Sequence, residues 1–129
     1  MTSELAVNER WLLPVLACIR QRPGMYLGDE RVETLAAYLS AYELGRVDVG
    51  GSGLDAKDAR LLQEFEGWIC AQTPEFGAQG TAGWSLLVRR VDSSAQNVRT
   101  FFTLFEQFLA TRGESLNNVT PWTPLASRL

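Results

Sequence analysis

The stretch SSAQNVRTFFTLFEQFLATRG, residues 93–113, decides the fold class. Its apolar residues recur at intervals of three and four, the spacing of one face of an α-helix. The stripe consists of Val98, Phe101, Phe102, Phe105, Phe108 and Leu109. Gly113 follows the stripe, and glycine commonly ends helices because it readily adopts the left-handed conformation. We therefore expect an amphipathic helix that buries its phenylalanines in a helical core.

Two segments nearer the N-terminus show the same period. Residues 8–21 place Leu12, Val15, Leu16 and Ile19 on one face, and Pro14 requires this helix either to kink or to begin at that point. A second helix is predicted from Asp29 or Glu30 to about Gly45, with an apolar face of Val32, Leu35, Ala36, Leu39 and Tyr42. Gly45 is the expected C-terminal stop, and residues 46–55 are expected to form a loop.

The middle of the chain predicts two more helices. Asp55 is the expected cap of a helix to about Gln72, which buries Ala59, Leu62, Phe65 and Ile69 with Leu61 and Trp68 at the flank. Residues 83–91 place Trp84, Leu87, Val88 and Val91 at helical spacing, although the apolar run LLVRRV is also compatible with a short strand.

Together these segments predict one compact all-α domain of about five helices. The helical domain is expected to span residues 1–113. Residues 114–129 are polar, with Pro121 and Pro124 on either side of Trp122, and we expect an extended C-terminal tail there.

Composition argues against several classes of function. The net charge of -3 disfavours nucleic-acid binding, and no apolar run approaches the ~20 residues of a membrane span. The first ten residues lack the apolar core of a secretory leader, so a cytoplasmic location is expected. Cys18 and Cys70 lie in apolar helical contexts without metal-ligand spacing, and the chain has no histidine. We therefore expect no metal, no cofactor and no catalytic activity.

Residues 22–28, RPGMYLG, stand between the first two predicted helices. Pro23 should end the first helix, while Gly24 and Gly28 permit positive φ on either side of a short crossing segment. Met25 and Leu27 are expected to fill the core, with the ring of Tyr26 inward and its hydroxyl outward. Arg20 and Arg22 can reach the last carbonyls of the first helix or a carboxylate such as Asp29. The main expectation is that this segment only joins the first helix to the second, and the alternative is that Arg22 and Tyr26 contact a partner.

Residues 19–45, which contain RPGMYLG followed by a predicted helix, resemble the start of the ATPase domain of bacterial DNA gyrase and topoisomerase IV. That resemblance implies nucleotide binding, with a general-base Glu and a metal-binding Asn on the helix. This chain has Glu33 and Glu43 in the corresponding stretch but no Asn, and it lacks a D-x-G-x-G motif. Hydrolysis of ATP is therefore not expected.

A second resemblance covers more of the chain, from about Ile19 to Leu109. The order of R-P-x-M-Y-L-G, L-x-x-Y-L-x-x-Y, F-x-x-W-I, G-W-x-L-L and F-F-x-L-F-x-x-F-L is similar to a family of small bacterial proteins associated with immunity against polymorphic toxins. The matching positions are Arg22, Pro23, Met25, Tyr26, Leu27, Gly28, Tyr42, Phe65, Trp68, Gly83, Trp84, Phe101, Phe102 and Phe105. This resemblance implies a non-catalytic protein that binds a cognate toxin.

The expected partner-binding residues are the acids near the motif together with neighbouring aromatic and arginine side chains: Arg22, Tyr26, Asp29, Glu30, Glu33, Tyr38 and Glu43. Asp29, Glu30 and Glu33 also suit the first turn of a helix, where acids interact favourably with the helix dipole. Two other functions stay open, a nucleotide-binding protein related to the gyrase-type ATPase and a helical scaffold that binds a small molecule. The oligomeric state is not predicted.

Overall fold

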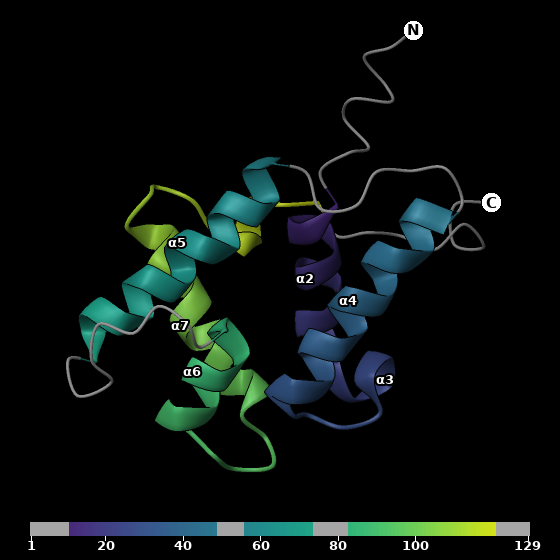
Figure 1. The fold of residues 1–129 in the computed structure, drawn as a ribbon, viewed down its shortest axis with the longest axis horizontal. Coiled ribbons are helices and arrows are strands. Elements are labelled where there is room, and N and C mark those ends of the chain that lie inside the picture. The colour runs from purple at the N-terminus through teal and green to yellow at the C-terminus, as the bar shows by residue number, and fades with distance from the viewer. Residues whose placement is uncertain (1–10, 49–55, 74–82, 121–129) are drawn as a thin grey trace, which may run out of the picture.

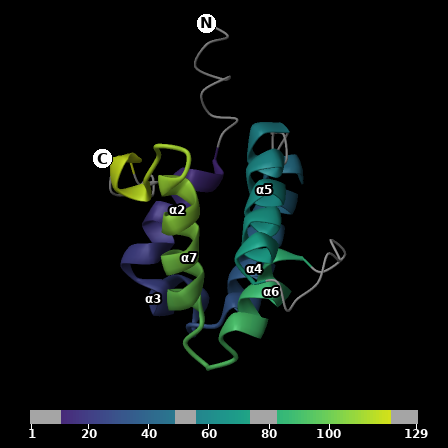
Figure 2. The same cartoon turned by 90° about the vertical axis from the view of Figure 1, so that its left-hand side faces the viewer.

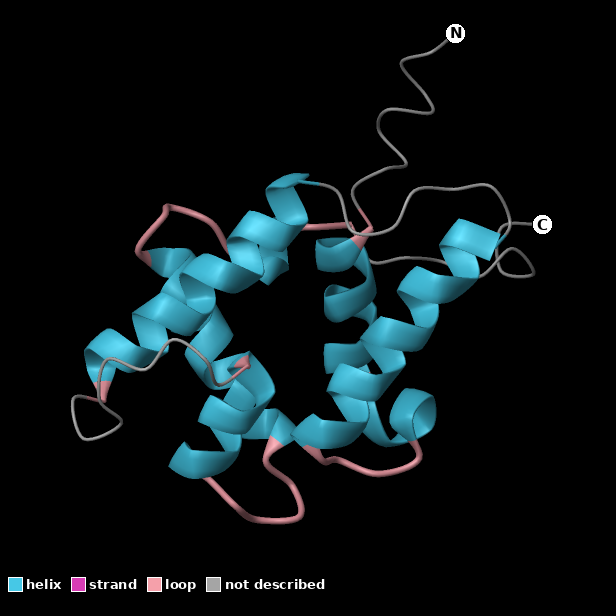
Figure 3. Ribbon diagram, in the orientation of Figure 1, coloured by secondary structure: helices cyan, strands magenta, loops and turns pink. Residues whose placement is uncertain are grey.

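The computed structural model describes residues 11–48, 56–73 and 83–120, and all regular elements in these ranges are helical (Figure 1). The elements are α2 (Leu12–Gln21), α3 (Pro23–Leu27), α4 (Val32–Asp48), α5 (Ala56–Gln72), α6 (Trp84–Val91), α7 (Val98–Ala110) and the 3-10 helix η2 (Leu116–Asn118). The predicted all-α fold is confirmed. No strand occurs in these ranges, so LLVRRV is helical and the mixed sheet of a gyrase-type domain has no counterpart in them (Figure 3).

The helices form two layers that face each other across the core (Figure 2). One layer contains α2, α3 and α7, and the other contains α4, α5 and α6. Close contacts join α7 to α4, α5 and α6, and they join α3 to both α2 and α4. α7 therefore contacts every helix of the opposite layer, and its apolar stripe lies between the two layers.

The predicted stripe of α7 is confirmed in full, since all six of its residues are buried. Phe65 of α5 inserts against this stripe and makes edge-to-face contacts with Phe101 and Phe105, at ring-centroid distances of 5.6 and 5.1 Å. Phe101 and Phe105 stack on each other at 5.3 Å. Such aromatic pairs contribute about 0.5–1.5 kcal/mol beyond the burial of their area.

α7 starts later than predicted, but Gly113 ends it as predicted. The helix begins at Val98, because residues 95–97 form a turn, and just before it Asp92 accepts a hydrogen bond from the Ser94 N–H at 2.9 Å. At the other end Gly113 has φ +73°, and the Glu114 N–H donates to the Leu109 carbonyl at 2.9 Å. This is the expected glycine stop, because the left-handed residue turns the chain back over the last carbonyls.

α2 begins at Leu12, which puts Pro14 in the first turn. A helix can accept proline there, because the first N–H groups have no partner within the helix. The two alternatives for Pro14 were a kink inside the helix and a helix start. The structure shows the helix start. Residues 8–10 of the predicted helix lie outside the described residues.

α4 runs beyond its predicted end. Gly45 was expected to stop the helix, but α4 continues to Asp48, so residues 46–48 are helical and do not belong to a loop. Gly45 does not have a positive φ, which a left-handed stop would require. A glycine inside a helix costs about 1 kcal/mol relative to alanine, and this cost did not end the helix.

The buried face of α5 is rotated from the predicted one. Leu61 is buried, whereas Leu62, which was expected in the core, and Ala59 are only half-buried. The inward row consists of Asp58, Leu61, Phe65 and Ile69, and Asp58 accepts a hydrogen bond from the Leu12 N–H at 3.4 Å. The expected cap Asp55 lies outside the described residues.

The predicted C-terminal tail begins with an ordered turn. Ser115 caps η2 by accepting a hydrogen bond from the Asn117 N–H at 3.0 Å, and Leu116 is only 1% exposed. Leu116 joins the hydrophobic core against α2, so core packing continues past residue 113. Residues 121–129, with Trp122, lie outside the described residues.

Candidate functional site

The RPGMYLG segment forms a short helix. Pro23 occupies its first turn, and Arg22 separates it from α2 with φ -147°. Gly28 ends it with φ +81°, and the Gly28 N–H donates to the Gly24 carbonyl at 2.9 Å. The predicted positive φ is therefore correct for Gly28 but wrong for Gly24, which is helical.

Tyr26 attaches α3 to α2. The Cys18 thiol donates a hydrogen bond to the Tyr26 hydroxyl at 3.0 Å, and the Tyr26 ring packs against the core. The hydroxyl therefore points to Cys18 and not outward as predicted. The contact with Cys18 raises the pKa of Tyr26, and burial and the neighbouring Tyr38 raise it further. Tyr38 of α4 is itself half-buried, and that burial raises its own pKa.

The outer side of α3 carries Arg22 and Met25, which are both exposed. Met25 was expected in the core, but its side chain is 61% exposed, and Leu27 is the residue that packs inward. A five-residue helix has one side to bury, and here Tyr26 and Leu27 occupy it. We define the α3 face as Arg22, Met25 and Asp29 together with the half-buried Tyr26 and Tyr38.

The acidic residues nearest α3 have separate local roles. Asp29 accepts hydrogen bonds from the Arg31 N–H at 3.1 Å and from the Thr34 hydroxyl at 2.9 Å, so it helps to cap α4. Glu30 pairs with Arg99 of α7 at 2.8 Å. The predicted start of this helix at Asp29 or Glu30 is therefore too early: α4 begins at Val32, only Glu33 lies in its first turn, and Glu30 instead bridges to another helix.

Two of the predicted partner-binding acids point away from α3. Glu33 lies 3.6 Å from the guanidinium of Arg89 on α6, in an exposed ion pair. Glu43 lines a cavity with Leu62 of α5 and Trp84 of α6. The predicted acids therefore have different neighbours: Glu33 pairs with α6 and Glu43 lines a cavity.

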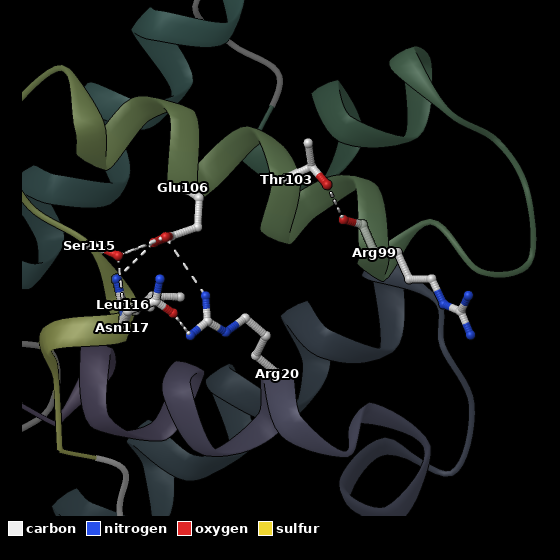
Figure 4. A network of polar contacts seen from close by, with 7 residues as sticks. All are labelled: Arg20, Arg99, Thr103, Glu106, Ser115, Leu116 and Asn117. Atoms are coloured by element: carbon white, nitrogen blue, oxygen red, sulfur yellow. Dashed lines mark hydrogen bonds and ion pairs between the residues drawn. The ribbon is translucent and has the colours of Figure 1, made fainter.

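Arg20 does not bind the end of α2 or Asp29, as the sequence suggested. Its guanidinium donates to the Asn117 side-chain oxygen at 2.7 Å and lies 3.7 Å from the Glu106 carboxylate (Figure 4). Glu106 also accepts hydrogen bonds from the Ser115 hydroxyl at 2.9 Å and the Leu116 N–H at 2.7 Å. This network fastens η2 to α2 and α7.

Asn97 is a buried polar residue that the sequence did not single out. Its side-chain oxygen accepts a hydrogen bond from the Val32 N–H at 2.7 Å, and its amide group donates to the Asp92 carbonyl at 2.9 Å. The only signal in the sequence is that asparagine, a common helix cap, precedes the apolar stripe. Nothing in the sequence indicates that it serves a second helix 65 positions away.

The described residues contain no group of three or more His, Cys, Asp or Glu side chains placed to hold a metal ion. Within the same ranges, no helix has the length and apolar character needed to cross a membrane. The candidate functional site is the α3 face, where Arg22 and Met25 are exposed. No protein-family model, curated protein or solved structure matches this chain.

Proposed function

We propose that this protein is a non-catalytic protein-binding module that acts as an immunity protein, neutralising a cognate bacterial toxin by direct binding. The observation that supports this most is the exposure of Met25 and Arg22 on α3 while Tyr26 and Leu27 hold that helix against the core. Binding would prevent the toxin from reaching its target, and no chemical step would follow.

The residue types on the α3 face are those that protein interfaces use. Methionine, arginine and tyrosine are enriched in interfaces relative to the rest of a protein surface. Met25 offers an apolar side chain that can adapt its shape to a partner. Arg22 offers several donors in a planar arrangement that suits carboxylates.

The attachment of α3 favours binding because it limits the entropy lost on association. The Tyr26 hydroxyl accepts a hydrogen bond from Cys18 of α2, and Gly28 ends α3 at its C-terminus. A surface that is already ordered does not pay the cost of ordering, about 0.5–1.5 kcal/mol for each immobilised side chain. The net charge of -3 adds a long-range attraction to a basic partner.

The first test is a native affinity purification of the tagged protein from its source organism, with bound proteins identified by mass spectrometry. The proposal expects a stoichiometric partner that carries a toxin domain. It also expects Met25→Glu to abolish capture, because a charge at the centre of the contact cannot be desolvated without a partner.

Leu44→Glu is the matched control, because Leu44 is also a large exposed apolar residue, at 67%, but lies on α4 outside the α3 face. Capture lost with Met25→Glu and retained with Leu44→Glu supports the α3 face. Capture that survives Met25→Glu unchanged contradicts the α3 face. A stoichiometric partner that is not a toxin contradicts the immunity role.

A further inference from the structure

A hollow of about 270 Å³ lies between α5 and the segment that follows α7. Most of its described lining residues are charged, and the lining consists of Lys57, Arg60, Leu61, Glu64, Arg112 and Glu114. Three bases and two acids give these residues a net charge of +1. The hollow is therefore locally positive, although the whole chain carries a net charge of -3.

The two acids of the hollow are both engaged by one arginine. Arg112 pairs with Glu114 at 3.1 Å and with Glu64 of α5. Its guanidinium also lies over the ring of Phe108, 5.6 Å from the centroid. Arg112 is therefore held in place, and the two carboxylates are directed at it.

Lys57 and Arg60 are the bases of the hollow that stay available. Both are exposed, and within the described part of the chain neither side chain forms a hydrogen bond or an ion pair. They lie three positions apart on α5, so they are neighbours on one face of the helix and repel each other. Glu64, one turn further along α5, pairs with Arg112 instead.

Lys57 also lies at the end of α5 that is less favourable for a cation. α5 begins at Ala56, so Lys57 is in its first turn, where the helix dipole favours negative charge. Asp58 is the acid of that turn, but it is fully buried and accepts a hydrogen bond from the Leu12 N–H at 3.4 Å. An anion in the hollow would relieve the repulsion between the two bases and the cost of a lysine at this position.

We propose that this hollow binds the phosphate group of a small ligand. A phosphate monoester carries a charge of about -1.5 to -2 at pH 7, which matches the two bases, and it has three strong acceptor oxygens. Arg60 can donate two parallel hydrogen bonds to such a group, and Lys57 adds a compact charge. The volume of about 270 Å³ is just below the range of drug-sized ligands, so it suits a small phosphate ester. The α3 face and this lining share no described residue.

The test is an NMR titration of the full chain with methyl phosphate, with sodium chloride at equal ionic strength as the reference. The proposal expects saturable shifts of the backbone amide signals of Lys57 and Arg60, while the signal of Met25 on the α3 face stays unchanged. Acetate, which carries a single charge, should bind more weakly. A parallel titration with inorganic phosphate distinguishes two sources of the group. Tighter binding of methyl phosphate assigns an ester, tighter binding of inorganic phosphate assigns the free ion, and either result supports a phosphate site.

Three variants test the two bases. Lys57→Gln and Arg60→Gln should each weaken binding of methyl phosphate roughly tenfold, because each removes a charge-assisted hydrogen bond. Arg60→Lys should bind more tightly than Arg60→Gln, since it keeps the charge without the planar pair of donors. Arg31→Gln is the matched control. Arg31 is also exposed and does not line the hollow, so its loss makes the same change in net charge and should leave binding unchanged.

The inference is overturned if neither methyl phosphate nor inorganic phosphate gives a saturable shift, or if Lys57→Gln and Arg60→Gln bind like Arg31→Gln. Equal affinity for acetate would overturn the preference for a doubly charged anion. Circular dichroism would show that each variant is folded, which is expected because the substituted residues are exposed.

Thermal unfolding provides a second measurement of the same site. A ligand that binds only the folded chain raises the melting temperature. Methyl phosphate should therefore raise the melting temperature of the parent protein and of Arg31→Gln more than that of a variant with both Lys57→Gln and Arg60→Gln. An equal rise in all three proteins would contradict the site.

Discussion

The side-chain oxygen of Asn97 accepts a hydrogen bond from the Val32 N–H at 2.7 Å, which joins the start of α7 to the start of α4. A second bond runs beside it, from the Val98 N–H to the Glu30 carbonyl at 3.0 Å. Asn97 is 1% exposed and Val32 is fully buried. The beginnings of two helices from opposite layers are therefore fastened together inside the protein.

Replacing Asn97 with alanine should lower the free energy of unfolding by about 1–3 kcal/mol, because the buried Val32 N–H would lose its acceptor. Urea denaturation followed by circular dichroism measures the change. Asn118→Ala is the control, since Asn118 is exposed, and it should have little effect. Equal stability of the two variants would show that the Asn97 bond contributes nothing.

Glu106→Ala should destabilise the protein by about 1–3 kcal/mol, because η2 would lose its bond at the Leu116 N–H and Arg20 would lose a charged neighbour. Glu106→Gln keeps an acceptor and should cost less. Gln107→Ala changes the next residue, which is exposed, and should be nearly neutral. Thermal unfolding of the three variants would test this order, and an equal loss for Ala and Gln would contradict it.

Two glycines of the RPGMYLG segment should respond to alanine in opposite directions. Gly28→Ala should cost about 1–2 kcal/mol because φ at this position is +81°. Gly24→Ala should be neutral or stabilise by up to ~1 kcal/mol, since Gly24 is helical and no atom lies within 4 Å of an added Cβ. Urea denaturation would measure both, and a shared sign would contradict this description of α3.

Asp92 should make stability depend on acid pH. A hydrogen bond from the Thr100 hydroxyl lowers the pKa of Asp92, and bonds from Ser94 lower it further. A lowered pKa means that the folded protein binds this proton less tightly than the unfolded chain. The contribution to stability is therefore present above the unfolded pKa of ~3.9, and it is lost as the pH falls through the lower folded value.

Thr100→Val should raise the pKa of Asp92 toward its ordinary value and reduce this acid dependence. An NMR titration of the Asp92 carboxyl carbon in both proteins measures the shift. The difference in urea midpoint between Asp92→Asn and the parent protein should be smaller at about pH 3 than at neutral pH. An unchanged Asp92 pKa in Thr100→Val would exclude Thr100 as its main cause.

The helices themselves were largely predictable because each apolar stripe repeats at the helical period. The six buried residues of α7 agree with the prediction, and Leu87 and Val88 of α6 are buried as expected. Val91 was expected on the same face of α6 but is 42% exposed. For α5 the period was correct but the face was not. Leu61 and Leu62 are adjacent apolar residues on neighbouring faces, and only the position of the other helices decides which one is buried.

The candidate site was predicted less well than the helices. RPGMYLG was correctly expected to connect two helices, but the sequence could not show that Met25 points outward or that Tyr26 binds Cys18. Glu33 and Glu43 lie on the same helix as Tyr38, but Glu33 pairs with Arg89 of α6 and Glu43 lines the cavity. Residues near each other in sequence need not share a surface, because helical rotation separates them.

The sequence by itself determined the helical class and the main apolar stripes, since these depend on residue order along single helices. It indicated the left-handed turns at Gly28 and Gly113, but the same expectation was wrong for Gly24 and Gly45, which are helical. Only the tertiary structure decided which carboxylate meets which arginine, the placement of Asn97 beside Val32 and the cavity that Glu43 lines. Those features join segments far apart in the chain, so they depend on how the helices pack.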